Sequence, residues 1–176
     1  MNLAYKKGFT LIETLIYGLI VSGMILISIL FSLSISDGSQ RARAYQEVQQ
    51  NARMAMDRIV QEIRAADDLN ASGSVFGANP GTLSLAHSDP GKNPTIFDVS
   101  GEKLRISQGG SATTTLTSDL VRVTNLTFTN LSVSNRTKNI YISLTVEHVN
   151  PGNDSVYAAS TTVRASATIR NQSDLP

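Results

Sequence analysis

Apolar residues are concentrated near the N-terminal end of this 176-residue chain. Residues 9–35 carry a single charge, that of Glu13, and Lys6 and Lys7 precede them. About 20 apolar residues are enough for a helix to cross the hydrocarbon core of a bilayer. The pattern therefore predicts a membrane-spanning helix over residues 9–35. Because lysines favour the cytoplasmic side, we expect the N-terminal end in the cytoplasm and the remainder of the chain outside.

A cleaved secretory signal peptide does not fit this segment. Such peptides have an apolar stretch of about 7–15 residues followed by a small-residue cleavage site. Here the apolar stretch is much longer, and no Ala-x-Ala-like site follows it. The run is therefore interpreted as an anchor.

The helical pattern continues in amphipathic form over residues 36–69. Apolar residues recur there at three- and four-residue steps, which places them on one stripe of a helix. The stripe consists of Val48, Ala52, Ala55, Ile59, Ile63 and Ala66. No proline interrupts the chain from Phe9 to Asp68, so we expect one helix of about 60 residues, roughly 90 Å long. Asp37-Gly38 is the candidate position for a bend.

A coiled coil is the competing interpretation of the stripe. Only about three heptads are present and the stripe is rich in alanine, so packing against the chain's own sheet is favoured. The charged residues lie mostly off the stripe and predict weak ion pairs at i,i+4 spacing. The expected pairs are Arg43–Glu47, Arg53–Asp57 and Arg64–Asp68.

Residues 70–176 predict a β-rich globular domain. Glycine, proline, serine and asparagine dominate residues 70–95, which indicates loops around one short strand at 82–87. Beyond them an alternating pattern rich in Val, Ile, Thr and Tyr predicts further strands. These are expected at Lys103–Ser107, Leu120–Thr129, Ile140–Val149 and Val156–Arg170. The long N-terminal helix followed by antiparallel strands is an α+β layout, with the helix stripe covering one face of the sheet.

Two local signals refine the strand prediction. The alternation changes phase at Asn125, which indicates a β-bulge. Asn150-Pro151-Gly152-Asn153 is a strong turn sequence between two long strands and predicts an antiparallel hairpin.

Composition excludes several classes of chemistry. The chain has no cysteine, which rules out disulfides, thiolate catalysis and cysteine-based zinc sites. The formal net charge is +1, aromatic residues make up 6%, and basic residues are scattered, so direct binding to nucleic acid is not expected.

No pattern of catalytic or metal-binding residues was found. His87 and His148 are the only histidines, and neither has a second histidine at metal-ligand spacing, so we expect surface or hydrogen-bonded structural roles. Asn150, Asn153 and Asp154 offer oxygen ligands in one loop, but turn chemistry explains them without calcium. No nucleotide-binding or nucleophile motif is present. We expect neither an enzyme nor a cofactor.

Glu13 is the unusual residue of the apolar segment. An acidic side chain at the centre of a membrane helix costs roughly 2.5–3.5 kcal/mol, and less toward the ends, so such residues usually have a partner and a function. No cation lies within the apolar run. A neighbouring subunit is the economical source of a counter-ion.

The string Lys6-Lys7-Gly8-Phe9-Thr10-Leu11-Ile12-Glu13 resembles the class III leader of type IV prepilins and type II secretion pseudopilins. The resemblance implies a pilin-like fold and a prepilin peptidase that cuts after Gly8 and removes residues 1–8. It implies that Phe9 becomes the N-methylated first residue. It also implies that Glu13 meets the N-terminal ammonium of a neighbouring subunit, in a pairing that sets register more than it adds stability.

Residues 50–64 are similar to the Arg- and Glu-rich segment of larger minor pilins and J-class minor pseudopilins. The apolar helix also lacks the proline that many major pilins have, since the first proline is Pro80. The chain is accordingly interpreted as a minor pilin or pseudopilin that joins a type IV pilus-like filament, with initiation or capping of the filament as further roles. The partners implied are other pilins, the peptidase/methyltransferase, a membrane assembly platform with its ATPase, and the lipid bilayer. The location implied is the bacterial cytoplasmic membrane and then the filament.

Two alternatives to a minor subunit remain at this point. The chain could be the major subunit of its filament, or it could be a membrane-anchored binding domain that never polymerises. The sequence leaves open whether a filament would serve adhesion, motility, DNA uptake or secretion, because one fold serves several functions.

Overall fold

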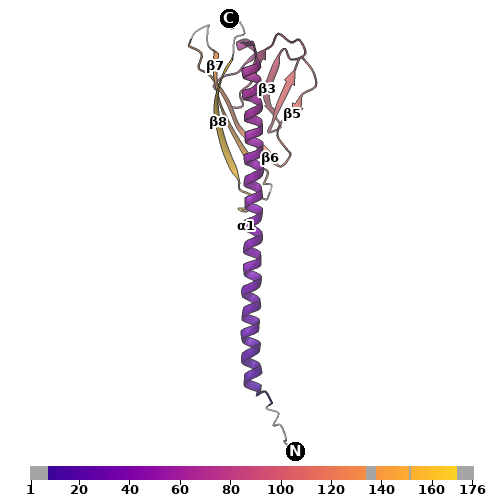
Figure 1. Ribbon diagram of the computed structural model, residues 1–176, viewed down its shortest axis with the longest axis vertical. Helices are drawn as coiled ribbons and strands as arrows, with labels where there is room; N and C mark the ends of the chain where they lie inside the picture. Colours follow the sequence, from indigo (N-terminus) through magenta and orange to yellow (C-terminus); the bar gives the residue numbers. More distant parts are fainter. Residues whose placement is uncertain (1–7, 134–137, 151, 170–176) are drawn as a thin grey trace, which may run out of the picture. The chain divides into compact units, whose positions relative to one another are not determined.

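The computed structural model describes residues 8–133, 138–150 and 152–169. The chain divides into two compact units, residues 1–40 and residues 41–176. One helix, α1 (Leu11–Ala65), supplies the described regular structure of the first unit and the first element of the second (Figure 1). The boundary between the units lies inside this helix. We call the second unit the head.

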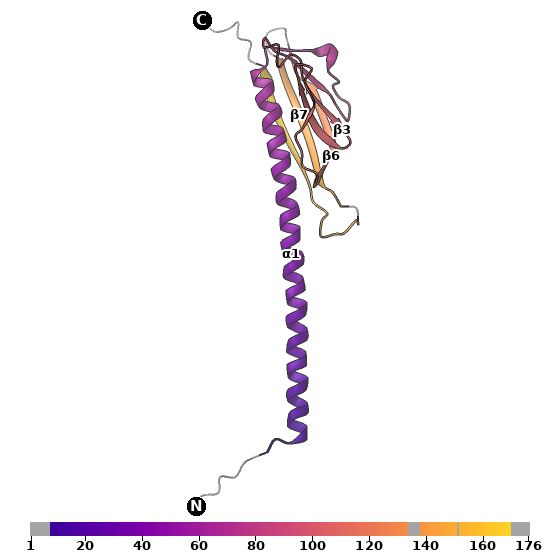
Figure 2. The same cartoon turned by 90° about the vertical axis from the view of Figure 1, so that its right-hand side faces the viewer.

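Two antiparallel sheets follow α1 in the head. The first has the strand order β1-β2-β3-β4-β5 and the second the order β6-β7-β8. The first sheet is built from β1 (Asp68–Leu69), β2 (Leu83–Ala86), β3 (Thr95–Ser100), β4 (Lys103–Gln108) and β5 (Thr114–Thr115), with the short 3₁₀ turn η1 (Ala71–Gly73) between β1 and β2. The second consists of β6 (Val121–Asn130), β7 (Lys138–His148) and β8 (Ser160–Ile169). Figure 2 shows β3, β6 and β7 along one side of the head part of α1.

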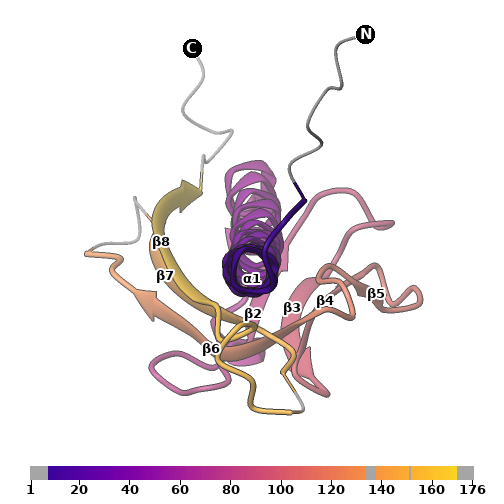
Figure 3. The same ribbon diagram turned by 90° about the horizontal axis from the view of Figure 1, so that it is seen from below.

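The predicted helix stripe forms the centre of the core. All six of its residues are at most 1% exposed. They meet the inward side chains of β7, where Ile140, Ile142, Leu144 and Val146 are fully buried at every second position. Figure 3 shows both sheets curving around the head part of α1. The predicted α+β architecture, a long helix packed on antiparallel strands, is confirmed.

The loop between η1 and β2 joins the two sheets. The backbone N–H groups of Gly77 and Gly81 donate to the carbonyl oxygens of Phe128 (2.9 Å) and Leu126 (2.8 Å) on β6. The Asn79 side chain adds two bonds to the same strand, one from Nδ2 to the Thr124 carbonyl at 3.1 Å and one from the Leu126 N–H to Oδ1 at 3.1 Å. This segment therefore satisfies the edge of β6 that β7 leaves open.

A polar network ties α1 to the segment before β6. The side chain of Asn51 is 8% exposed; its Oδ1 accepts from the Ser118 N–H at 2.8 Å, and its Nδ2 donates to Glu47 Oε1 at 2.9 Å. The Ser118 hydroxyl also donates to Glu47 Oε1, at 3.0 Å. Lys103 Nζ donates to the Val121 carbonyl at 2.8 Å and so holds the other end of the same segment. Both polar atoms of the Asn51 side chain therefore have hydrogen-bond partners, so its burial leaves no unsatisfied polar group.

Several strand predictions needed correction. The bulge at Asn125 is confirmed by a register shift between Val123 and Asn125. The strand at 95–100 was missed because glycine and proline surround it in the sequence. The antiparallel pairing of β7 with β8 is confirmed, but β8 begins at Ser160 instead of Val156. The described residues between β7 and β8 form a longer loop, in which the Asn150 side chain bonds to both the N–H and the carbonyl of Asp154; Pro151 lies outside the described residues.

The charged residues of α1 also pair differently from the prediction. Among the described residues, none of the three expected i,i+4 ion pairs is present. The i,i+4 pair that does form is Arg58–Glu62, with 2.8 Å between Nη2 and Oε1. Glu47 is used by the Asn51 network, and Asp68 pairs with Lys138 on β7. Tertiary partners outcompete neighbours on the helix because local pairs contribute only a few tenths of a kcal/mol. At Gly38 the helix continues without a break.

The end of α1 is fastened by two adjacent carboxylates. Asp67 accepts hydrogen bonds from the Ser88 hydroxyl and N–H, and these bonds lower the pKa of Asp67 below its ordinary value of 3.8. Asp68 accepts from Lys138 Nζ and from the Leu69 N–H, and the bond from Lys138 is the main cause of its lowered pKa. The two carboxylates therefore connect the chain just after α1 to later parts of the head, Asp67 to the segment after β2 and Asp68 to β7.

Truncation of the helix stripe should destabilise the head strongly. Ile59 is fully buried, so Ile59→Ala should lower the free energy of unfolding by about 2–5 kcal/mol. Met54 lies on the same helix and is 60% exposed, so Met54→Ala should cost less than about 0.5 kcal/mol. Thermal and denaturant unfolding of the detergent-solubilised chain, followed by the circular dichroism of its tyrosines, measures both. Equal effects of the two substitutions would contradict the packing described.

The two carboxylates at the end of α1 should make stability depend on pH. Their folded-state pKa values lie below the unfolded value of 3.8, so their contribution is present above that value and is lost as the pH falls through the folded pKa. Asp68→Asn should therefore destabilise the head near neutral pH, by less than about 1 kcal/mol because the pair is half-exposed. This difference from wild type should shrink as the pH falls below about 4.

Unfolding of both proteins across the acidic range measures this effect. Asp57→Asn, which removes an exposed carboxylate from the same helix, controls for the loss of one negative charge. A difference between wild type and Asp68→Asn that grows toward low pH would overturn the assignment.

Candidate functional site

The first turn of α1 is set by a local capping sequence. Thr10 precedes the helix, and its Oγ1 accepts from the Glu13 N–H at 3.3 Å. Its carbonyl accepts from the N–H groups of Glu13 (3.1 Å) and Thr14 (3.2 Å). A threonine cap with glutamate three residues later is a favoured start of a helix. The four residues Thr10 to Glu13 therefore begin the helix and place the carboxylate in its first turn, where the helix dipole favours a negative charge.

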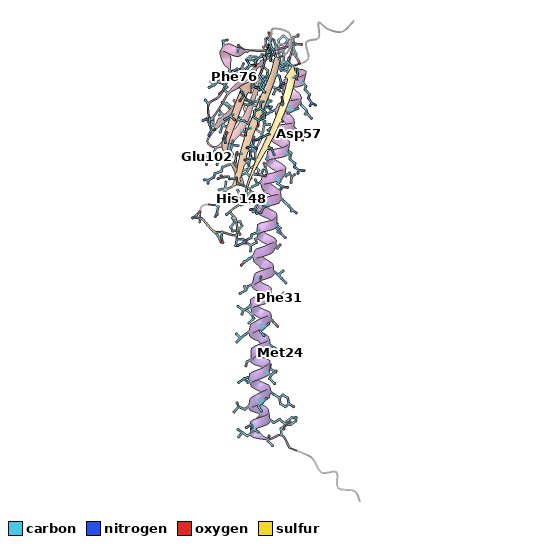
Figure 4. The ribbon with its side chains drawn as sticks, turned by 90° about the vertical axis from the view of Figure 1, so that its left-hand side faces the viewer. Met24, Phe31, Asp57, Phe76, Glu102 and His148 are labelled. Atoms are coloured by element: carbon cyan, nitrogen blue, oxygen red, sulfur yellow. The ribbon has the colours of Figure 1, made fainter. Side chains whose placement is uncertain are left out.

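The large apolar side chains of α1 from residue 11 to residue 35 are all solvent-exposed. Their exposed fractions range from 50% to 82%. They lie on every side of the helix, as the labelled Met24 and Phe31 and their neighbours show in Figure 4. An 18-residue window of α1 has a mean hydropathy of 2.4 and no buried residue. By length and composition, this part of α1 can cross a membrane, which agrees with the predicted span.

Three hydroxyl groups of this segment are satisfied within the helix. Thr14 Oγ1 donates to the Leu11 carbonyl at 2.9 Å. Ser22 Oγ donates to the Leu19 carbonyl at 3.0 Å, and Ser28 Oγ donates to the Met24 carbonyl at 2.9 Å. In hydrocarbon a polar group without a partner costs several kcal/mol. These side chains therefore do not oppose insertion of the helix into a bilayer.

The predicted site residues lie together at the start of α1. Gly8 and Phe9 precede the helix and have no regular secondary structure. Phe9 is 73% exposed, and its ring contacts that of Tyr17 edge-to-face, with 6.2 Å between the centroids. A side chain built on Gly8 would meet no atom within 4 Å. The peptide bond between Gly8 and Phe9 is therefore not enclosed by the described residues. Lys6 and Lys7 lie outside them.

Glu13 is half-buried on an otherwise apolar surface. Within the described part of the chain, no ion pair includes Glu13. Its backbone N–H is bonded to Thr10. The helix dipole supplies partial compensation, typically 0.3–1 kcal/mol. That is well below the cost of a carboxylate in hydrocarbon, so Glu13 still needs a cation once the segment leaves water.

The two histidines of the head each have a ring nitrogen without a partner in the described part of the chain. Among the described residues, no group of three histidine, aspartate or glutamate side chains could hold a metal ion. His87 is 8% exposed and its Nε2 has no partner, while His148 stacks on Tyr157 with 5.7 Å between ring centroids and has an unpartnered Nδ1. Packing within the head therefore buries one nitrogen of each ring.

The loop after β7 uses its side-chain oxygens for its own backbone. Asn150 Oδ1 accepts from the Asp154 N–H at 3.0 Å, and Asp154 Oδ1 accepts from the Val156 N–H at 2.9 Å. Asn150 Nδ2 donates to the Asp154 carbonyl at 2.7 Å. The predicted turn chemistry of these residues is confirmed.

No family model, curated protein or solved structure matches this chain.

Proposed function

We propose that this protein is a minor pilin or pseudopilin, a structural subunit of a type IV pilus-like filament. The observation that carries the proposal is Glu13, a carboxylate in the first turn of an exposed apolar helix, without a cation among the described residues. The resemblance of residues 6–13 to a prepilin leader supplies the counter-ion. Cleavage after Gly8 makes Phe9 the N-terminus, and its ammonium in another copy or a related subunit can pair with Glu13.

The exposed surface of the apolar segment supports assembly by helix packing. In the membrane this surface is solvated by lipid, and in a filament core it is covered by the same segments of other subunits. A lone charge in such a core is heavily penalised, whereas a bonded pair of opposite charges recovers much of the cost. Subunits that place Glu13 opposite an N-terminal ammonium are therefore favoured over those in any other register. The pair selects the register and the apolar surface supplies the attraction.

The same proposal fixes orientation and partners. The N-terminal end lies in the cytoplasm, where the peptidase/methyltransferase acts, and the head lies outside the cytoplasmic membrane. Extraction of the apolar segment from lipid requires energy from an assembly platform with its ATPase. The long apolar helix equally suits a membrane-anchored domain that never polymerises, and that alternative predicts that the bond after Gly8 stays intact. A major subunit differs from a minor one in abundance, because it would dominate purified filaments.

The N-terminus of the native protein should begin at Phe9. Mass spectrometry of the chain purified from a host with prepilin peptidase should give N-methylated Phe9, with residues 1–8 absent. Gly8→Val should block this processing, because a side chain at this position hinders entry of the backbone into a tight protease site. An intact Met1 in the wild-type protein would exclude the filament proposal in favour of the membrane-anchored domain.

Glu13→Ala should leave processing intact and prevent incorporation into filaments. Loss of one partner from a buried ion pair costs about 3–5 kcal/mol, so incorporation should fall by more than about 100-fold. Glu13→Asp keeps the charge and should restore part of the incorporation. Asp37→Ala, which removes the acidic residue at the other end of the apolar segment, is the matched control and should assemble normally. Filament content is measured by immunoblot of sheared, sedimented filaments, and normal incorporation of Glu13→Ala would refute the role of the carboxylate.

A further inference from the structure

Two exposed apolar side chains of the head lie beside each other on different loops. Leu120, just before β6, is 55% exposed, and Val149, just after β7, is 37% exposed. The Val149 N–H donates to the Leu120 carbonyl at 2.8 Å, which fixes the two residues as neighbours. More than half of Leu120 and more than a third of Val149 thus stay open to solvent in the described head. We call this pair the basal pair.

The basal pair lies at the end of the head where α1 enters it. Ser118, two residues before Leu120, bonds to Glu47 and Asn51, which are close to the start of the head at residue 41. Figure 4 shows His148, the residue before Val149, at this same end of the head. The strand β6 leads away from the basal pair, so Leu131 lies at its opposite end, roughly 33 Å away at about 3.3 Å per residue.

The chain itself brings this end of the head close to a membrane. Only residues 36–40 separate the predicted span from the head, and even fully extended they reach about 17 Å. Tyr45, which is 48% exposed, and the exposed Arg41 and Arg43 occur at the same end. Aromatic and basic residues beside apolar ones are typical of the membrane–water interface. Asp119, the acidic neighbour of Leu120, has a cation partner in Lys103 at 3.5 Å.

We propose that the basal pair inserts into the interfacial region of the phospholipid bilayer and docks the head on the outer surface of the membrane while the subunit is still anchored there. The proposal rests on the membrane anchoring given above. Lipid contact removes Leu120 and Val149 from water, and the polar loop after β7 stays among the headgroups. Extraction of a subunit from the membrane then includes release of the head from lipid.

The test uses the absence of tryptophan from the chain, which makes any introduced tryptophan a unique reporter. The full chain is reconstituted into phosphatidylcholine vesicles whose acyl chains are brominated near the headgroups, or into the same vesicles without bromine. The tryptophan of Leu120→Trp should emit at a shorter wavelength than a tryptophan fully exposed to water. It should also lose at least about half of its fluorescence in the brominated vesicles. Val149→Trp is a second reporter of the same contact, in case the first variant misfolds.

Two controls separate the possible failures. Leu131→Trp, at the other end of β6 and with a similar exposure of 48%, should show almost no quenching. Phe31→Trp lies in the span and must be quenched; if it is not, the anchoring itself fails. Quenching at Phe31→Trp without quenching at Leu120→Trp or Val149→Trp would overturn the docking proposal alone. If the emission at Leu120→Trp or Val149→Trp changes with the protein-to-lipid ratio but not with bromine, the basal pair contacts other copies of the chain. That result would also overturn the docking proposal.

Discussion

The apolar surface of α1 between residues 11 and 35 has to be covered by something other than water, and everything proposed for this protein depends on that constraint. Seventeen large side chains there are at least half exposed. At about 25 cal/mol per Å² of apolar surface, leaving such a surface in water is prohibitive for a stable monomer. Lipid can cover it, and so can the same segment of other subunits. A filament that grows out of a membrane exchanges the first cover for the second.

In the proposed filament, Glu13 favours neighbouring helices over lipid, which otherwise cover the apolar surface about equally well. Lipid and neighbouring helices solvate apolar side chains almost equally well, so helix association in a membrane needs packing or polar contacts to drive it. A carboxylate near the helix start supplies such a contact, provided that a cation arrives with the neighbour. The capping sequence from Thr10 to Glu13 holds the carboxylate at a defined place in the first turn. In the proposed filament, the residue that takes part in this local backbone motif is also the one that pairs with the neighbouring subunit.

The head uses the second half of the same helix in the opposite way. There the apolar residues occupy one stripe and are buried by two sheets, so this part is satisfied within the monomer. Asn51 and Glu47 fix the segment before β6 against the helix, and Asp68 reaches Lys138 on β7. In α1, the apolar residues of the second half are therefore buried within the head, whereas those of the first half need lipid or other subunits to cover them. Under the proposed function, the head supplies the stability of the monomer and the apolar segment supplies the surface for assembly.

Local patterns of apolar and polar residues were enough to predict many elements of the structure from the sequence alone. The span, the buried stripe from Val48 to Ala66, the alternation of β7 and the bulge at Asn125 are repeated signals carried by adjacent residues, and the structure agrees with each. The tertiary structure alone decided that the strands form two sheets, that the loop around Asn79 closes the edge of β6, and that Asp68 pairs with Lys138 instead of Arg64. These features join residues far apart in the chain, and no local pattern encodes which distant groups meet. They are settled by the packing of the whole head, which buries each polar group only where a partner is within reach.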